Sequence, residues 1–222
     1  MITTPWPDLL ICDLDGTLVD SIEGIARTTR ATLLAAGLRL PAESEVWPLI
    51  GLPLVDVFKT LTPVTTTVEE IARLVATYRD IYARLAIPTT RAFPGVAETL
   101  VRYREAGGRV AIATSKLAGI ATAALEAAHL LPLVDVVMGH DSVANPKPAP
   151  DMVFRCLEAT SVTGDHALVV GDTTFDLEMA AAAGVRACAV TTGVHSREQL
   201  LTARPLAVVD SFGDVLTVWF SR

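Results

Sequence analysis

Short runs of apolar residues alternate along the chain with longer amphipathic stretches. The runs are bounded by charged or turn-forming residues, which is typical of strands that are buried on both faces of a parallel sheet. Six such strands are predicted, at residues 9–12, 110–113, 134–138, 167–170, 187–190 and 206–209. Between them, helical periodicity occurs at residues 94–106, 116–128, 150–159 and 173–183. This alternation predicts an α/β fold with a doubly wound, mainly parallel sheet.

Residues 20–91 break this alternation, because no strong strand pattern occurs among them. Helices are predicted at residues 21–36 and 68–86. The segment between these helices must consist of several short elements, because it contains prolines that interrupt helices; they are Pro41, Pro48, Pro53 and Pro63. We therefore expect a helical insertion after the first strand. The rest of the chain then has the size of one ordinary domain, about 150 residues.

Composition and charge narrow the classes of protein. Hydrophobic residues make up 51% of the 222-residue chain and charged residues 19%, which excludes an intrinsically disordered protein. The net charge of −7 argues against binding to nucleic acid. The cysteines Cys12, Cys156 and Cys188 have neither a disulfide nor a zinc-binding pattern. No apolar run is long enough to span a membrane, and no signal peptide is recognised. We expect a reduced, cytoplasmic protein that acts on neither nucleic acid nor a membrane.

Four short polar segments are expected at the edge of the sheet where open α/β folds bind ligands. In chain order they are Asp13-Leu14-Asp15-Gly16-Thr17, Thr114-Ser115-Lys116, Lys147-Pro148, and Gly171-Asp172 with Asp176. The carboxylates would repel one another unless a cation lay between them. Pooled carboxylate oxygens form a hard site that suits Mg²⁺, which often bridges to a substrate phosphate. The acidic residues therefore predict a magnesium site.

The other polar residues in these segments suit an anion. Thr114 and Ser115 offer hydroxyl and N–H groups at a strand-to-helix turn, which is a common binding place for phosphate. Lys147 lies between two prolines and would supply a compensating positive charge. Carboxylates, a metal ion, a lysine and a hydroxyl together are the groups that phosphoryl transfer requires.

The order and spacing of the four segments resemble the four motifs of the haloacid dehalogenase superfamily. The resemblance covers essentially the whole chain. The insertion is similar to the helical cap of the phosphoglycolate phosphatase-like branch, as are the stretches Leu18-Val19-Asp20-Ser21, Gly51-Leu52-Pro53 and Phe93-Pro94-Gly95-Val96. The resemblance implies a Rossmann-like core domain at residues 1–19 and 92–222, and a helical cap domain at residues 20–91.

The resemblance also implies a role for each acidic residue. Asp13 would attack phosphorus and become an aspartyl phosphate. Asp15 would protonate the leaving group and later activate water. Mg²⁺ would be held by the carboxylates of Asp13 and Asp172 and by the backbone carbonyl of Asp15, with Asp176 on the metal side.

The remaining motif residues are implied to bind the phosphoryl group. Thr114 and Lys147 would contact its oxygens, and Lys147 would also steady the nucleophile. Gly16 and Ser115 complete the expected phosphate-binding set. Ser115 is a departure from the pattern, because many relatives have asparagine there.

The resulting hypothesis is a Mg²⁺-dependent phosphatase that hydrolyses a small phosphorylated metabolite, either phosphoglycolate-like or a sugar phosphate. Three alternatives stay open. A phosphonoacetaldehyde hydrolase would need a cap lysine near Leu54, but the nearest is Lys59. A phosphosugar mutase similar to β-phosphoglucomutase would carry a Ser-Arg pair after Gly51, which this chain lacks. A metabolite-binding regulator without turnover would keep the same motifs.

Three further polar residues are not expected to take part in the reaction. Lys116 is predicted to be an exposed lysine at the start of a helix, and His140 and His195 are predicted at the surface. Whether Lys59 or any of these three contacts a substrate stays open at this point, as does the oligomeric state.

Overall fold

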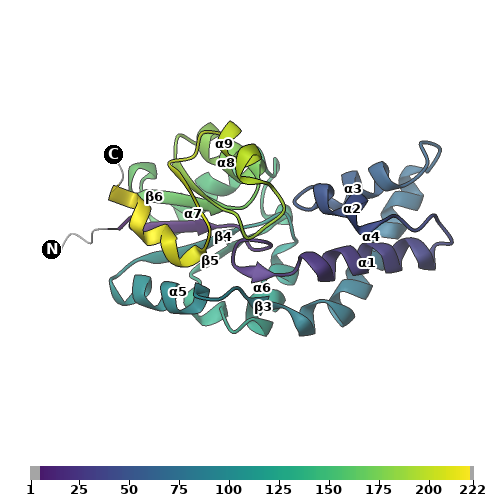
Figure 1. Cartoon of the computed structure of the whole chain (residues 1–222), viewed down its shortest axis with the longest axis horizontal. Coiled ribbons are helices and arrows are strands. Elements are labelled where there is room, and N and C mark those ends of the chain that lie inside the picture. The colour runs from purple at the N-terminus through teal and green to yellow at the C-terminus, as the bar shows by residue number, and fades with distance from the viewer. Residues whose placement is uncertain (1–5, 221–222) are drawn as a thin grey trace.

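The core of the molecule is a parallel six-stranded sheet. We describe residues 6–220 of the chain from a computed structural model (Figure 1). The strand order is β5-β4-β1-β6-β7-β8. The strands are β1 Leu9–Cys12, β4 Arg109–Ala113, β5 Val136–Met138, β6 Ala167–Gly171, β7 Arg186–Val190 and β8 Ala207–Val209. The predicted doubly wound sheet is confirmed.

Helices cover both faces of this sheet, which is why its central strand is continuously apolar. Leu10 and Cys12 of β1 face one layer, and Leu9 and Ile11 face the other, all without exposure to solvent. The first layer contains α5 Val96–Glu105, α6 Ala118–Ala127 and the 3₁₀-helical stretch Phe212–Phe220. The second contains α7 Asp151–Thr160, α8 Thr174–Ala182 and α9 Arg197–Thr202.

A separate helical cap lies to one side of this core (Figure 1). Its helices are α1 Ile22–Ala35, α2 Glu43–Val46, α3 Leu54–Leu61 and α4 Val68–Leu85. They share a core of their own, in which Leu33, Phe58 and Tyr82 are fully buried. Helix α4 begins with a reciprocal capping arrangement, because Thr67 and Glu70 each accept a hydrogen bond from the other's backbone N–H. The expected helical insertion is confirmed.

Two short strands that the apolar pattern did not reveal join the cap to the core. Strand β2, Val19–Asp20, pairs antiparallel with β3, Arg91–Ala92. Each strand has only two residues, which is too short to give an alternating pattern. The predicted domain boundaries at residues 20 and 91 fall on paired residues of this ribbon, whereas the predicted ends at residues 1 and 222 lie outside the described residues.

Candidate active site

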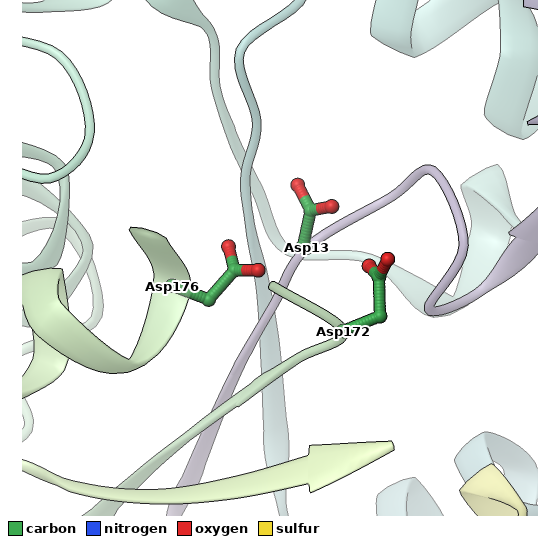
Figure 2. Close-up of side chains that lie close together, drawn as sticks. All are labelled: Asp13, Asp172 and Asp176. Carbon is green, nitrogen blue, oxygen red and sulfur yellow. The ribbon is translucent and has the colours of Figure 1, made fainter. Parts of the chain in front are cut away.

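Three carboxylates meet at the carboxyl edge of the sheet. Asp13 follows β1, Asp172 follows the neighbouring strand β6, and Asp176 lies in the first turn of α8. One oxygen from each carboxylate lies within 4.8 Å of the others. Figure 2 shows the three side chains gathered in one place, although they come from separate parts of the backbone. Parallel pairing of β1 with β6 therefore brings residues that are far apart in the sequence into one cluster.

Asp172 is held by hydrogen bonds and by two close glycines. Its carboxylate accepts a hydrogen bond from the Thr17 hydroxyl at 2.8 Å and from the Val194 N–H at 3.2 Å. A Cβ atom at Gly193 would lie 1.6 Å from Asp172 Oδ2, and one at Gly16 would lie 2.5 Å from it. Both positions therefore require glycine for the backbone to approach the carboxylate this closely.

Lys147 links the other two carboxylates. Its ammonium donates to Asp13 Oδ1 at 2.7 Å and also to Asp176 Oδ1. Asp176 is further fixed by Thr173, whose N–H and hydroxyl donate to Asp176 Oδ2 at 3.0 and 2.7 Å. Lys147 is buried, and burial alone would lower its pKa. The adjacent Asp13 and Asp176 outweigh that effect and raise the pKa of Lys147 above its usual value.

One lysine does not balance the charge of this cluster. Burial raises the pKa of Asp13 to about 7, in spite of the opposing effect of Lys147. Burial also raises the pKa of Asp172 well above its ordinary value, and the nearby Asp13 and Asp176 raise it further. A divalent cation among these oxygens would favour their ionised forms. The set of buried carboxylate oxygens fits Mg²⁺, so Asp13, Asp172 and Asp176 are the candidate residues to hold it.

The carboxylate of Asp15 belongs to a different group of contacts. It forms an ion pair with the ammonium of Lys116 and accepts a hydrogen bond from the Ser21 hydroxyl. The prediction that Lys116 is an exposed helix-start residue is therefore wrong. The Lys116 ammonium also lies 4.7 Å from the centre of the Tyr82 ring in the cap. The attraction of Asp15 and the aromatic face together draw this lysine inward.

In the structure, the residues that are expected to bind phosphate contact other groups of the protein. Thr114 is buried, and its hydroxyl accepts the N–H of Lys116 at 3.3 Å. The Ser115 hydroxyl donates to the carbonyl of Gly51 in the cap at 2.7 Å. The N–H of Gly16 donates to the carbonyl of Val19 at 3.0 Å, so it is used within the turn. Their roles toward phosphate stay predictions.

A cavity of about 130 Å³ lies where the cap meets this edge of the sheet. Its core side includes Asp13, Asp15, Thr114, Ser115, Lys116, Lys147, Asp172 and Asp176. Its cap side comes from α1, α3, α4, the last residue of α2 and the turn around Gly51. All the predicted catalytic side chains therefore face one space that both parts of the chain enclose.

The surface prediction for His140 is wrong as well, whereas His195 is partly exposed and does not line the cavity. His140 lines the cavity, and its buried Nδ1 makes no hydrogen bond. His195 is partly buried, and its Nδ1 accepts the N–H of Thr174 at 3.1 Å. Burial lowers the pKa of His195, which suits an imidazole that accepts a hydrogen bond. Both histidines follow the ends of strands. The expectation that polar residues at strand ends lie near the ligand site therefore applied to them as it did to the aspartates.

Some contacts of the site were not predicted, although Thr17 and Ser21 lie in stretches that the sequence singled out. Thr17 and Gly193 act on Asp172, and Ser21 acts on Asp15. Gly193 follows β7 at the same edge of the sheet, so its position was a usable signal. The contact between Ser21 and Asp15 depends on how the chain turns after Gly16, which leaves no periodic pattern.

Comparison with known proteins agrees with this geometry. The family model described as haloacid dehalogenase-like hydrolase matches residues 10–190. The chain belongs to that family. A relative in Dickeya dadantii named "Probable phosphatase IndB" is 37% identical over 210 residues, which cover 94% of this chain and 91% of the relative. A phosphoglycolate phosphatase of Rhodospirillum rubrum is 33% identical, and the match covers 94% of this chain and 89% of that protein.

Solved structures of other hydrolases have the same fold. A hydrolase from Pseudomonas syringae superposes with a TM-score of 0.83 at 28% identity, and the match covers 94% of this chain and 95% of that one. A haloacid dehalogenase-like family hydrolase from Streptococcus pneumoniae gives 0.85 at 25% identity, with coverage of 97% and 99%. The resemblance drawn from the four motifs is therefore confirmed. Among the described residues, no helix is both long and apolar enough to cross a membrane.

Proposed function

We propose that this hydrolase is a Mg²⁺-dependent phosphatase of a small phosphorylated metabolite. The observation that carries the proposal is the buried cluster of Asp13, Asp172 and Asp176, with Lys147 bonded to the first and last of them. Such a cluster combines a nucleophile, a metal site and a cation at one point. The names of the relatives, a phosphoglycolate phosphatase among them, support the same reaction.

In the first half-reaction, an oxygen of Asp13 attacks phosphorus while the bond from phosphorus to the leaving alcohol breaks. Asp15, once protonated, gives that proton to the departing oxygen, so that no alkoxide is released. Lys147 orients Asp13 and contacts the phosphoryl oxygens together with Thr114. When bound, Mg²⁺ would neutralise charge on the phosphoryl group and on the surrounding carboxylates.

In the second half-reaction, Asp15 removes a proton from water as the water oxygen attacks the aspartyl phosphate. The bond between phosphorus and Asp13 then breaks, which releases phosphate and restores both carboxyl groups. The cap, for which we propose residues 20–91, would shield this intermediate from bulk water and contact the leaving group.

The structure weakens one of the alternative functions, and the sequence weakens a second. Lys59 has a side chain that is 61% exposed, lies 3.6 Å from Asp56 and is not among the residues that line the cavity. A Schiff base on that lysine would form away from the cluster. Leu54 lines the cavity instead. No serine-arginine pair that would suit a mutase follows Gly51.

The cysteines support a proposal for the cellular location. Cys12, Cys156 and Cys188 are unpaired and buried. Free thiols without a disulfide suit a reducing compartment, so we propose a cytoplasmic protein.

Phosphate release tests the function directly. The protein would be assayed with a panel of phosphorylated metabolites and with acetyl phosphate, in Mg²⁺ or in EDTA. We expect release that requires Mg²⁺ and that Asp13→Asn abolishes while the variant stays folded. A parent protein that binds members of the panel but releases no phosphate from any of them would be a regulator, and the proposal would fail.

A further inference from the structure

The cap side of the cavity is almost entirely apolar. Its wall contains Ile25, Val46, Leu49, Leu52, Val57 and Val75. Tyr78 and Tyr82 of α4 complete it, with their rings stacked at 5.7 Å between centres and 17° between planes. Burial raises the pKa of Tyr78, so its phenol stays neutral. This wall therefore offers a leaving group a hydrophobic surface with an aromatic pair.

Most polar groups near this wall already have partners, and the Tyr82 hydroxyl and His140 Nδ1, which have none among the described residues, are themselves buried. The Thr29 hydroxyl donates to the carbonyl of Ile25 at 2.9 Å, and the Ser115 hydroxyl donates to Gly51. Lys116 is paired with Asp15. Of the described cap residues that line the cavity, Arg79 is the charged one, and it is exposed. A carboxylate or several hydroxyls on the leaving group would therefore lose water here and find few matching partners, which is costly.

We infer that the substrate is a phosphate monoester of a small apolar alcohol, whose hydrocarbon part packs against Tyr78, Tyr82 and the aliphatic wall. This inference rests on the proposed function and names the substrate class of the same site. The cavity of about 130 Å³ must hold the phosphoryl group as well, so its volume agrees with a small leaving alcohol. Phosphoglycolate and sugar phosphates, the substrates that the family resemblance suggested, should be turned over poorly.

The test compares phosphate monoesters that all release an alkyl alcohol but differ in whether that alcohol is apolar or polar. Benzyl phosphate and propyl phosphate carry apolar alkyl groups, whereas phosphoglycolate carries a carboxylate and glucose 6-phosphate carries hydroxyls. None releases an activated phenoxide, so differences in kcat/KM report contacts with the cap. We expect kcat/KM for benzyl phosphate to exceed that for phosphoglycolate by roughly tenfold or more, the effect of leaving polar groups unpaired.

Two substitutions to arginine test whether the cap wall causes the preference for an apolar leaving group. Leu52→Arg places a cation in the wall, and should lower the ratio of benzyl phosphate to phosphoglycolate kcat/KM by roughly tenfold. Val64→Arg is the matched control, since Val64 is fully exposed on the cap and does not line the cavity. It should leave the ratio unchanged. If Leu52→Arg does not fold, the comparison of substrates on the parent protein still decides the question.

A third variant tests the opposite hypothesis, in which Arg79 anchors an acidic substrate. We expect Arg79→Ala to keep the preference of the parent protein for benzyl phosphate over phosphoglycolate. A parent protein that prefers phosphoglycolate, and loses that preference in Arg79→Ala, would overturn the inference while leaving the phosphatase proposal intact. Absence of Mg²⁺-dependent release from every probe, acetyl phosphate included, would overturn both.

Discussion

The ammonium of Lys116 and the carboxylate of Asp15 form an ion pair in which each side chain is only 13% exposed. The pair ties together two separate motifs of the core, and Tyr82 of the cap lies against the lysine. Asp15 is thereby held apart from the cluster of Asp13, Asp172 and Asp176. Lys116 is thus a positioning residue for the proposed proton donor.

Removal of that lysine should slow the reaction without abolishing metal binding. Because Asp15 would lose the contact that orients it, we expect Lys116→Ala to lower kcat by roughly 10²-fold, as misplaced catalytic groups do. Lys116→Arg should recover part of the loss, since it keeps the positive charge. Lys59→Ala, which removes an exposed cap lysine, is the control. Unchanged kcat in a folded Lys116→Ala protein would exclude this role.

A methyl group at Gly193 should damage the metal site. The added Cβ would collide with Asp172 Oδ2, so the carboxylate would have to move. We expect Gly193→Ala to weaken the apparent affinity for Mg²⁺ by about 10- to 100-fold, the effect seen when groups that orient metal ligands are altered. Gly119→Ala serves as the control, because nothing lies within 4 Å of a Cβ at that position. Calorimetric titration with Mg²⁺ would show the difference, and equal affinities would refute the expectation.

The hydrogen bond from Ser115 to Gly51 links a core motif to the cap. Ser115→Ala should loosen the turn around Gly51, which hydrogen exchange at residues 50–54 would detect. The loss of one hydrogen bond should lower kcat/KM by no more than about tenfold. Ser44→Ala, an exposed cap substitution, provides the comparison. Inhibition by inorganic phosphate in Ser115→Ala tests the separate prediction that this serine binds phosphate: weaker inhibition would support it, and unchanged inhibition would contradict it.

Asp135 should make the unfolding free energy of the protein depend on pH in the acid range. Partial burial raises its pKa, but hydrogen bonds from Arg104 and the Val110 N–H outweigh burial and lower it overall. The stabilisation is therefore present above the ordinary carboxyl pKa, and it is lost as pH falls through the folded-state value. Asp135→Asn should cost about 1 kcal/mol of unfolding free energy at neutral pH.

Urea titrations of the parent and Asp135→Asn proteins at pH 7 and in acid would measure this. The difference between them should shrink as pH falls. Asp80→Asn, on the exposed face of α4, should show little difference at either pH. A difference for Asp135→Asn that grows in acid would contradict the stated direction.

The parts of the site that follow from sheet geometry were predictable from the sequence. Apolar runs located β1 and β6, and parallel pairing then required Asp13 and Asp172 to lie side by side. Lys147 was predictable for another reason, because buried carboxylates need a cation. In each case a local pattern and a general rule about strand ends were sufficient.

Contacts set by the path of loops were not predictable in this way. The burial of Lys116 depends on Asp15 and Tyr82, which are 101 and 34 residues away in the sequence. Helical periodicity places Lys116 at a helix start, but it does not show which cap residue packs against it. The apolar character of the cavity wall likewise appears only when α1, α3 and α4 are assembled around one space.

The most direct test of the account is to trap the reaction on Asp13. The protein would be mixed with substrate and Mg²⁺, quenched in acid within one turnover, and treated with borohydride, which reduces an aspartyl phosphate to homoserine. Peptide mass spectrometry should find homoserine at position 13 in the parent protein and none in Asp13→Asn. Mg²⁺-dependent phosphate release with an unmodified Asp13 at every quench time, or with homoserine at Asp15 or Asp172 instead, would contradict the account.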